Sequence, residues 1–148
     1  MILWNLLSAS AGLMYIVPII GYLLTQKSYY IIGFVGLFGT LCIGEFLKHI
    51  VIQDRSPRPA GAEDCNLWCN DGAQAGRPGM PSTHSAQAIF FATFYSHYAS
   101  RPWITVVLYG YAILVMLSRY IKQCHTLPQI IMGAALGWGI SWCVRYRA

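Results

Sequence analysis

Long stretches without charge are the feature that most constrains this chain. Among residues 1–44 only Lys27 carries a charged side chain, and residues 81–100, 102–118 and 127–144 contain no Asp, Glu, Lys or Arg. Each stretch approaches the roughly 20 apolar residues that a membrane helix needs. Charged residues make up 10% of the chain, against about 25% in ordinary soluble domains. These numbers exclude a soluble domain and predict an all-α protein.

We expect a multi-pass transmembrane helical bundle with about five spans. Residues 1–148 would form one integral membrane domain, because the length leaves no room for a large soluble module. The first span would be retained, since no basic region precedes it. Several glycines suit close packing between membrane helices. They are Gly33, Gly36, Gly39, Gly133, Gly137 and Gly139.

The charges are divided between the two ends of these spans. All five acidic residues lie within residues 45–71, between the second and third spans. Alternating spans bring that loop, the start of the third span and the connection between the fourth and fifth spans to one face. The other face would carry Lys27, Arg101, Arg145 and Arg147 without acidic residues. By the positive-inside tendency that face is cytosolic, and the polar face looks into a lumen, the periplasm or the exterior.

Three polar clusters therefore converge on one membrane face, and we expect an anion site there. In the first, Lys48 and Arg55 are seven residues apart, so a continuing helix would project both from one side. Arg58 is a second candidate cation just beyond them. The plainer alternative is a basic interfacial rim with a snorkelling lysine. The net charge of +5 is scattered over span edges, which favours an anionic lipid over nucleic acid as the partner.

The second and third clusters each place a histidine beside a helix start. Residues 81–85 read Pro-Ser-Thr-His-Ser, and a helix beginning there offers free backbone N–H groups to a phosphate. Capping by Ser82 or Thr83 is the alternative interpretation. In the third cluster, Arg119 suits bidentate phosphate contact. Gln129 follows His125 by four residues, so its amide oxygen could accept from one imidazole nitrogen and leave the other free.

In this order the clusters resemble the three signature motifs of the type 2 phosphatidic acid phosphatase superfamily. The matching elements are Lys48 with six residues before Arg55, Pro-Ser-Thr-His-Ser at 81–85, and Ser-Arg at 118–119 with five residues before His125. Val-Ile-Gln at 51–53, Gly-Met at 79–80 and Gln129 are similar to the dolichyl-diphosphatase branch. The resemblance implies a membrane helical bundle with its active site at one membrane face. It also implies hydrolysis of a polyprenyl diphosphate without a metal or cofactor.

The roles that the resemblance implies can be carried over residue by residue. His125 would be the nucleophile that forms a phosphohistidine, His84 the general acid and then the base, and Gln129 the orienting partner of His125. The remaining positions would bind the phosphate oxygens. They are Lys48, Arg55, Arg58, Ser82, Thr83 and Arg119.

The activity expected is removal of the terminal phosphate of a dolichyl-type diphosphate, with the endoplasmic reticulum as the compartment and a lumenal active site. A broader lipid phosphate phosphatase and a catalytically silent lipid-binding membrane protein are the alternatives. The sequence does not indicate an oligomeric state.

The sequence departs from the superfamily pattern at two positions, after Arg55 and at Gln129. Arg55 is followed by Ser56 where the superfamily has proline, and an Arg-Pro pair comes three residues later; the kept spacing favours Arg55 over Arg58. Gln129 stands where the superfamily usually has aspartate, and an amide can fix the tautomer of His125 without stabilising its positive charge.

Cys65 and Cys69 could form a disulfide in a lumenal loop. A zinc site on these two cysteines is less favoured, because no fourth ligand is evident.

Overall fold

The computed structural model describes residues 1–146, so the expected cytosolic charge at Arg147 lies outside the described residues. The first rod consists of α1 (Ile2–Ala9), a short 3₁₀ turn and α2 (Leu13–Thr25). Next come α3 (Ser28–Phe46) and a π-helical turn, η2 (Leu47–Ile52). Three helices follow the long polar loop: α4 (Thr83–His97), α5 (Pro102–Ile121) and α6 (Leu127–Tyr146). Residues 1–146 contain no β-strand, so the predicted all-helical fold is confirmed.

Within residues 1–146, four of the helical rods are long and apolar enough to cross a membrane. They are Ile2–Thr25, Ser28–Arg55, Pro102–Ile121 and Leu127–Tyr146. Their outer faces expose large apolar side chains such as Val35, Val106 and Ile131, which suits contact with lipid. The predicted third span forms α4, which has only 15 residues.

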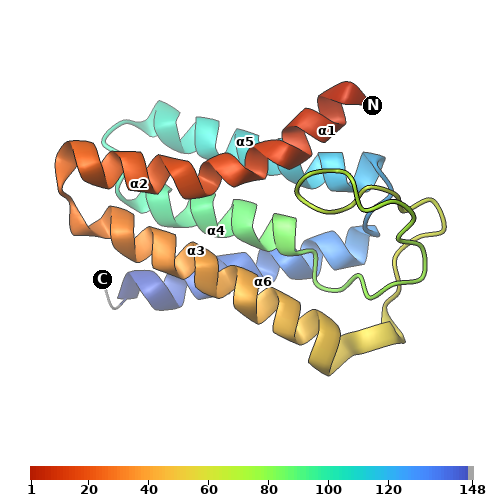
Figure 1. The fold of residues 1–148 in the computed structure, drawn as a ribbon. Helices are drawn as coiled ribbons and strands as arrows, with labels where there is room; N and C mark the ends of the chain where they lie inside the picture. Colours follow the sequence, from red (N-terminus) through yellow and green to blue (C-terminus); the bar gives the residue numbers. More distant parts are fainter. Residues whose placement is uncertain (147–148) are drawn as a thin grey trace.

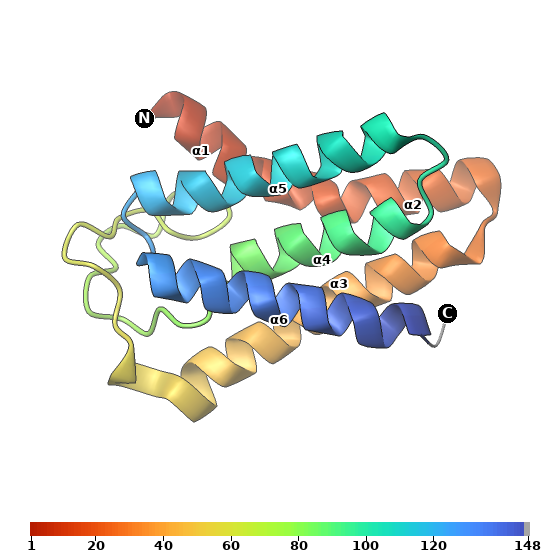
Figure 2. The same ribbon diagram turned by 180° about the vertical axis from the view of Figure 1, so that it is seen from behind.

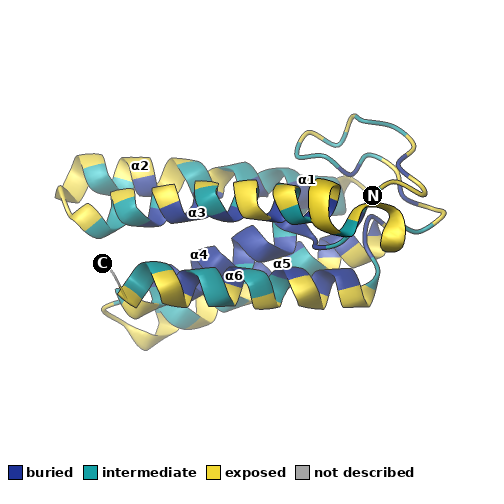
Figure 3. Ribbon diagram, turned by 90° about the horizontal axis from the view of Figure 1, so that it is seen from below, coloured by how far each residue is buried: buried dark blue, intermediate teal, exposed yellow. Residues whose placement is uncertain are grey.

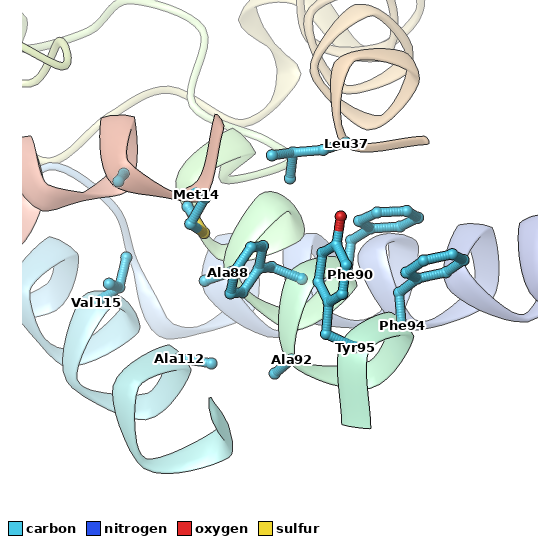
Figure 4. Packing of buried hydrophobic residues seen from close by; sticks show 11 residues of the cluster. Met14, Leu37, Ala88, Phe90, Ala92, Phe94, Tyr95, Ala112 and Val115 are labelled. Atoms are coloured by element: carbon cyan, nitrogen blue, oxygen red, sulfur yellow. The ribbon is translucent and has the colours of Figure 1, made fainter. Parts of the chain in front are cut away.

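Helix α4 lies at the centre of the bundle. Figures 1 and 2 show it enclosed by the other rods, and Figure 3 shows its buried surface between them. Its buried residues extend from Thr83 to Tyr95 and are not confined to one face of the helix. Its Phe90 and Phe94 are fully buried and belong to one core cluster with Leu37 of α3 and Val115 of α5 (Figure 4). The central helix is therefore fixed by all its neighbours, and the position of its first turn is fixed with it.

Helix α6 approaches α4 closely because two glycines face it. A Cβ at Gly133 would collide with the backbone oxygen of Ser82, and one at Gly137 with that of Ala86. The backbone N–H of Ser82 also donates to the carbonyl of Gln129 at 3.0 Å. Close packing was expected at Gly39 and Gly139 as well, but a Cβ added at either position would meet nothing within 4 Å, so that expectation was wrong there. The contact at Gly133 brings the start of α4 against the start of α6.

Candidate active site

The three polar clusters meet at the end of the bundle that also holds the long loop. Figure 1 shows the loop before α4 and the connection between α5 and α6 at this same end. A cavity of about 320 Å³ opens there. Its polar lining comes from four parts of the chain and includes Glu45, Lys48, Arg58, Thr83, His84 and His125. The topology expected from the sequence therefore brings the clusters together.

The first cluster differs from the sequence prediction in which arginine it presents. The α-helix ends at Phe46, continues as the π-helical turn η2, and reverses at Gln53, which has a φ of +52°. Because the helical register is lost, Arg55 no longer shares a face with Lys48. Arg55 is exposed, whereas Arg58 lines the cavity. The preference for Arg55 on spacing is thus not matched by the geometry.

Two cationic side chains of this cluster face the cavity with unused hydrogen-bond donors. Lys48 is only 4% exposed, and its Nζ donates to Glu45 Oε1 at 2.6 Å and to Thr83 Oγ1 at 2.8 Å. An ammonium has three N–H donors, so one remains free. Arg58 donates from Nε to the carbonyl of Pro78 at 3.4 Å, and its buried Nη1 has no partner in the described part of the chain. Both groups are therefore free to bind an anion.

The second cluster forms the first turn of α4. Ser82 is the N-cap residue; its hydroxyl pairs with that of Ser85 at 2.9 Å, and it does not line the cavity. Thr83 donates to Glu45 Oε1 at 2.5 Å. His84 faces the cavity, and its shielded Nε2 has no partner among residues 1–146. Of the two hydroxyl residues expected to hold phosphate, only Thr83 reaches the cavity, and its Oγ1 is already engaged.

Arg119 of the third cluster is fully buried behind the cavity. Its two terminal nitrogens donate to the Ser8 hydroxyl and to the carbonyl of Cys65, while its Nε has no partner within the described residues. The backbone N–H of Cys124 bonds to the Arg119 carbonyl at 3.0 Å. Arg119 thus connects α1, the long loop and the α5–α6 connection, and it adds positive charge close to His125.

The imidazole of His125 is held by Gln129. Nδ1 of His125 lies 3.3 Å from Gln129 Oε1. Nε2 of Gln129 donates to the carbonyls of Ser56 and Pro57, at 3.2 and 2.9 Å, and lies 3.0 Å from the Ser56 hydroxyl. These oxygens fix the orientation of the amide, so its oxygen accepts and Nδ1 carries the proton. Nε2 of His125 is then the nitrogen with a free lone pair.

The environment of His125 keeps the ring neutral. The side chain is 2% exposed. Burial lowers the pKa of His125 well below its usual 6.5, and the positive charges of Arg119, Arg58 and Lys48 lower it further. A neutral imidazole with one free nitrogen is a competent nucleophile or base. The site thus combines cations, which attract an anion, with a group that can react with it.

A disulfide ties the long loop to this histidine. Cys65 is bonded to Cys124, with 5.5 Å between their Cα atoms. The possible pairing of Cys65 with Cys69 is therefore not formed; Cys69 is a free thiol, 3.0 Å from Lys122 Nζ. A zinc site using Cys65 would need the thiolate that the disulfide removes. Because Cys124 adjoins His125, the bridge holds the loop over the cavity beside the imidazole.

Sequence reasoning missed several groups at the cavity. Glu45 could have been found, because it precedes Lys48 by three residues on one helix. Asp71, Asn66 and Leu67 come from the irregular loop, and no sequence signal predicts their place. Gln87 lies one turn after His84 on α4 and could have been found from helical spacing.

Comparisons with known proteins agree with the motifs. The family model described as the PAP2 superfamily matches residues 10–148. "Lipid phosphate phosphatase gamma" of Arabidopsis thaliana is 33% identical over 113 residues, covering 68% of this chain and 46% of the relative. "Lipid A 4'-phosphatase" of Helicobacter pylori is 35% identical over 84 residues, covering 56% of this chain and 37% of the relative.

A third relative has two activities in its name. "Palmitoyl-protein thioesterase-dolichyl pyrophosphate phosphatase fusion 1" of Schizosaccharomyces pombe is 29% identical over 115 residues, covering 70% of this chain and 17% of the relative. The chain thus spans less than half the length of each of these three proteins. No solved structure matches it significantly.

Proposed function

This chain belongs to the PAP2 superfamily, and from that premise we propose that it is a membrane phosphohydrolase. Its substrate would be a polyprenyl diphosphate of the dolichyl type, and the reaction would remove the terminal phosphate. The observation that supports this best is the set of unpartnered polar groups at one cavity: the third N–H of Lys48, Nη1 of Arg58 and the ring atom Nε2 of His84. Buried donors without partners are rare in folded proteins, and a bound phosphate would satisfy them.

The proposed reaction has two steps. Nε2 of His125 attacks the terminal phosphorus, the N–P bond forms, and the P–O bond to the prenyl phosphate breaks. His84 gives a proton to the leaving oxygen. In the second step His84 takes a proton from water, whose oxygen attacks the phosphohistidine; the N–P bond breaks and phosphate is released. Gln129 holds the reacting tautomer throughout, and Lys48, Arg58 and Arg119 stabilise the developing charge.

The runner-up is a broader lipid phosphate phosphatase, and the names of two relatives favour it. Those names describe a lipid phosphate and lipid A, whereas only the fusion protein's name includes a dolichyl pyrophosphate. Residues typical of the dolichyl branch, above all Gln129, support the diphosphate substrate instead. A silent lipid-binding protein is the third alternative. The buried, neutral His125 argues against it, because anion binding alone needs no such nucleophile.

We also propose that the cavity faces the lumen of the endoplasmic reticulum. Disulfides persist in oxidising compartments, and Cys65–Cys124 lies at this face. The turns at Lys27 and Arg101 lie at the opposite end of the bundle. The positive-inside tendency and the disulfide are independent arguments for one orientation. Labelling of Cys69, which is free, tests it: reaction only from the cytosolic side would contradict the proposal.

Phosphate release by purified protein in detergent tests the activity. Dolichyl diphosphate, phosphatidate and lipid A should be compared at equal concentration, with His125→Ala and His84→Ala as variants. Equal release by the wild type and both variants would exclude the enzyme hypothesis, and faster release from phosphatidate or lipid A would favour the runner-up. Terminally ³²P-labelled substrate, quenched in base, should leave label on the wild-type protein but not on His125→Ala. Wild-type protein that turns over without ever retaining label would count against a phosphohistidine.

A further inference from the structure

Glu45 is a carboxylate inside a site built to bind an anion. Its Oε1 accepts from Lys48 Nζ at 2.6 Å and from Thr83 Oγ1 at 2.5 Å, and Lys48 also donates to Thr83 at 2.8 Å. Three groups from two helices thus share one set of short contacts. Glu45 itself lines the cavity. A negative charge at this position repels phosphate, so its presence needs an explanation beyond anion binding.

An ordinary surface ion pair does not account for this arrangement. Exposed pairs contribute little to stability, about 0–1 kcal/mol. Lys48, however, has a side chain only 5% exposed, whereas that of Glu45 is 41% exposed. A buried ammonium without a partner is costly, so before substrate binds Lys48 depends on Glu45. The contact with Thr83 extends the link to the residue directly before His84, at the first turn of α4.

The geometry also fixes where the remaining donor of Lys48 points. Glu45 and Thr83 occupy two of the three N–H groups of the ammonium. The third is the only one left for a phosphate oxygen, and its direction is set by the other two. Without the carboxylate, the flexible four-carbon side chain could turn all three donors toward the anion. Phosphate would then be held more tightly, and the released product would leave more slowly.

We propose that Glu45 is a positioning residue that orients Lys48 and Thr83 and keeps the affinity for product phosphate low. This inference rests on the proposed phosphohydrolase function. During each turnover Lys48 is shared between the carboxylate and the phosphate, and after hydrolysis Glu45 takes it back. Loss of the carboxylate therefore strengthens phosphate binding while slowing turnover. A purely structural role for Glu45 would reduce the active fraction and leave phosphate affinity unchanged.

The test is Glu45→Gln, which keeps the size of the side chain and removes its charge. Glu63→Gln is the matched control, because Glu63 is an exposed carboxylate in the following loop and does not line the cavity. His49→Gln is a second control, since Glu45 Oε2 also lies 3.2 Å from the exposed His49. Inorganic phosphate binding is measured by titration calorimetry on the purified proteins without substrate. Turnover is measured in parallel with dolichyl diphosphate.

We expect phosphate to bind Glu45→Gln about tenfold more tightly than wild type, as for the loss of one nearby like charge. In the same variant kcat should fall at least about tenfold while KM falls or stays constant, and both controls should match wild type. If the wild type binds phosphate measurably and Glu45→Gln binds it with the same affinity, the role proposed for Glu45 is wrong, while the proposed phosphohydrolase function is unaffected. Wild-type protein that binds no phosphate and hydrolyses no lipid phosphate overturns the proposed function instead.

Discussion

Gln129 offers the sharpest test of the site, because it stands where relatives of this type usually carry a carboxylate. The substitution Gln129→Glu keeps the length of the side chain and its acceptor for His125 Nδ1. It replaces the donor Nε2, which lies 3.2 and 2.9 Å from the carbonyls of Ser56 and Pro57, by a charged oxygen. The Ser56 hydroxyl can rotate to donate to that oxygen, but the two carbonyls cannot. The carbonyl of Pro57 loses its donor, whereas that of Ser56 keeps the backbone N–H of Gly79 at 3.0 Å. Both carbonyls then face a negative charge at contact distance.

The size of the effect follows from these two contacts. An acceptor shielded from water and left without its partner costs about 1–3 kcal/mol, so the loss at Pro57 alone costs up to about that much before any repulsion is counted. For a chain of this length, 2 kcal/mol corresponds to a fall in Tm of at least about 4 °C. Because the displaced segment carries the turn before Arg58, turnover should fall together with the melting temperature. The opposite expectation is that a carboxylate stabilises the imidazolium of His125 and raises the rate.

The assay is thermal unfolding in detergent, followed by turnover measured below the transition. Gln123→Glu is the matched control, because Gln123 is exposed and lies in the same connection between α5 and α6. That control should keep the wild-type Tm within about 1 °C, as surface substitutions usually do. A Gln129→Glu variant that melts with the control and turns over at least as fast as wild type would refute the argument that the amide is required as a donor.

The remaining predictions concern the arginines, the pH profile and the disulfide. Arg58→Ala should lower kcat/KM by about ten- to a hundredfold, since a charge-assisted contact is worth about 1.5–3 kcal/mol. Arg55→Ala should stay within about threefold, and a larger loss in Arg55→Ala than in Arg58→Ala would favour Arg55 as the phosphate ligand instead. The pKa of His125 is lowered well below 6.5, so this nucleophile stays neutral as pH falls, and the acid limb of kcat/KM should lie below pH 6.5. A limb above pH 7 would contradict a neutral buried imidazole. Cys124→Ala removes a disulfide whose cysteines are separated by 59 in the sequence, and this should lower the free energy of unfolding by about 4 kcal/mol. The disulfide is first confirmed in the wild type by counting free thiols. An unchanged melting curve in the variant would then show that the disulfide adds no stability.

Much of the fold could be predicted from the sequence because the membrane restricts the choices. Backbone groups in lipid must bond within a helix, so uncharged stretches become helices and alternate in direction. That alternation was enough to bring Lys48, His84 and His125 to one end. No further structural detail was needed to place the three motifs near each other.

The finer details of the site depend on local geometry that spacing does not encode. Seven residues from Lys48 would reach Arg55 on an ideal helix, but the π-helical turn and the reversal at Gln53 bring Arg58 forward instead. The partner of Cys65 is 59 residues away, and only the path of the irregular loop shows that Cys124 is near. Gln129 was recognised as a partner of His125, but its two carbonyl acceptors come from the same loop and could not be foreseen.

The shortness of α4 has a consequence for how a lipid reaches the cavity. Helices α4 and α5 are joined by a tight turn at the far end of the bundle and run antiparallel, with 15 and 20 residues. At about 1.5 Å per residue, the start of α4 lies roughly 8 Å short of the end of α5, and Figure 1 shows α4 beginning before α5 ends along the bundle. His84 is therefore sunk below the rim of the bundle. A lipid phosphate would have to descend toward the hydrocarbon to react, so the tail can remain dissolved in the leaflet throughout turnover and never has to be extracted into water.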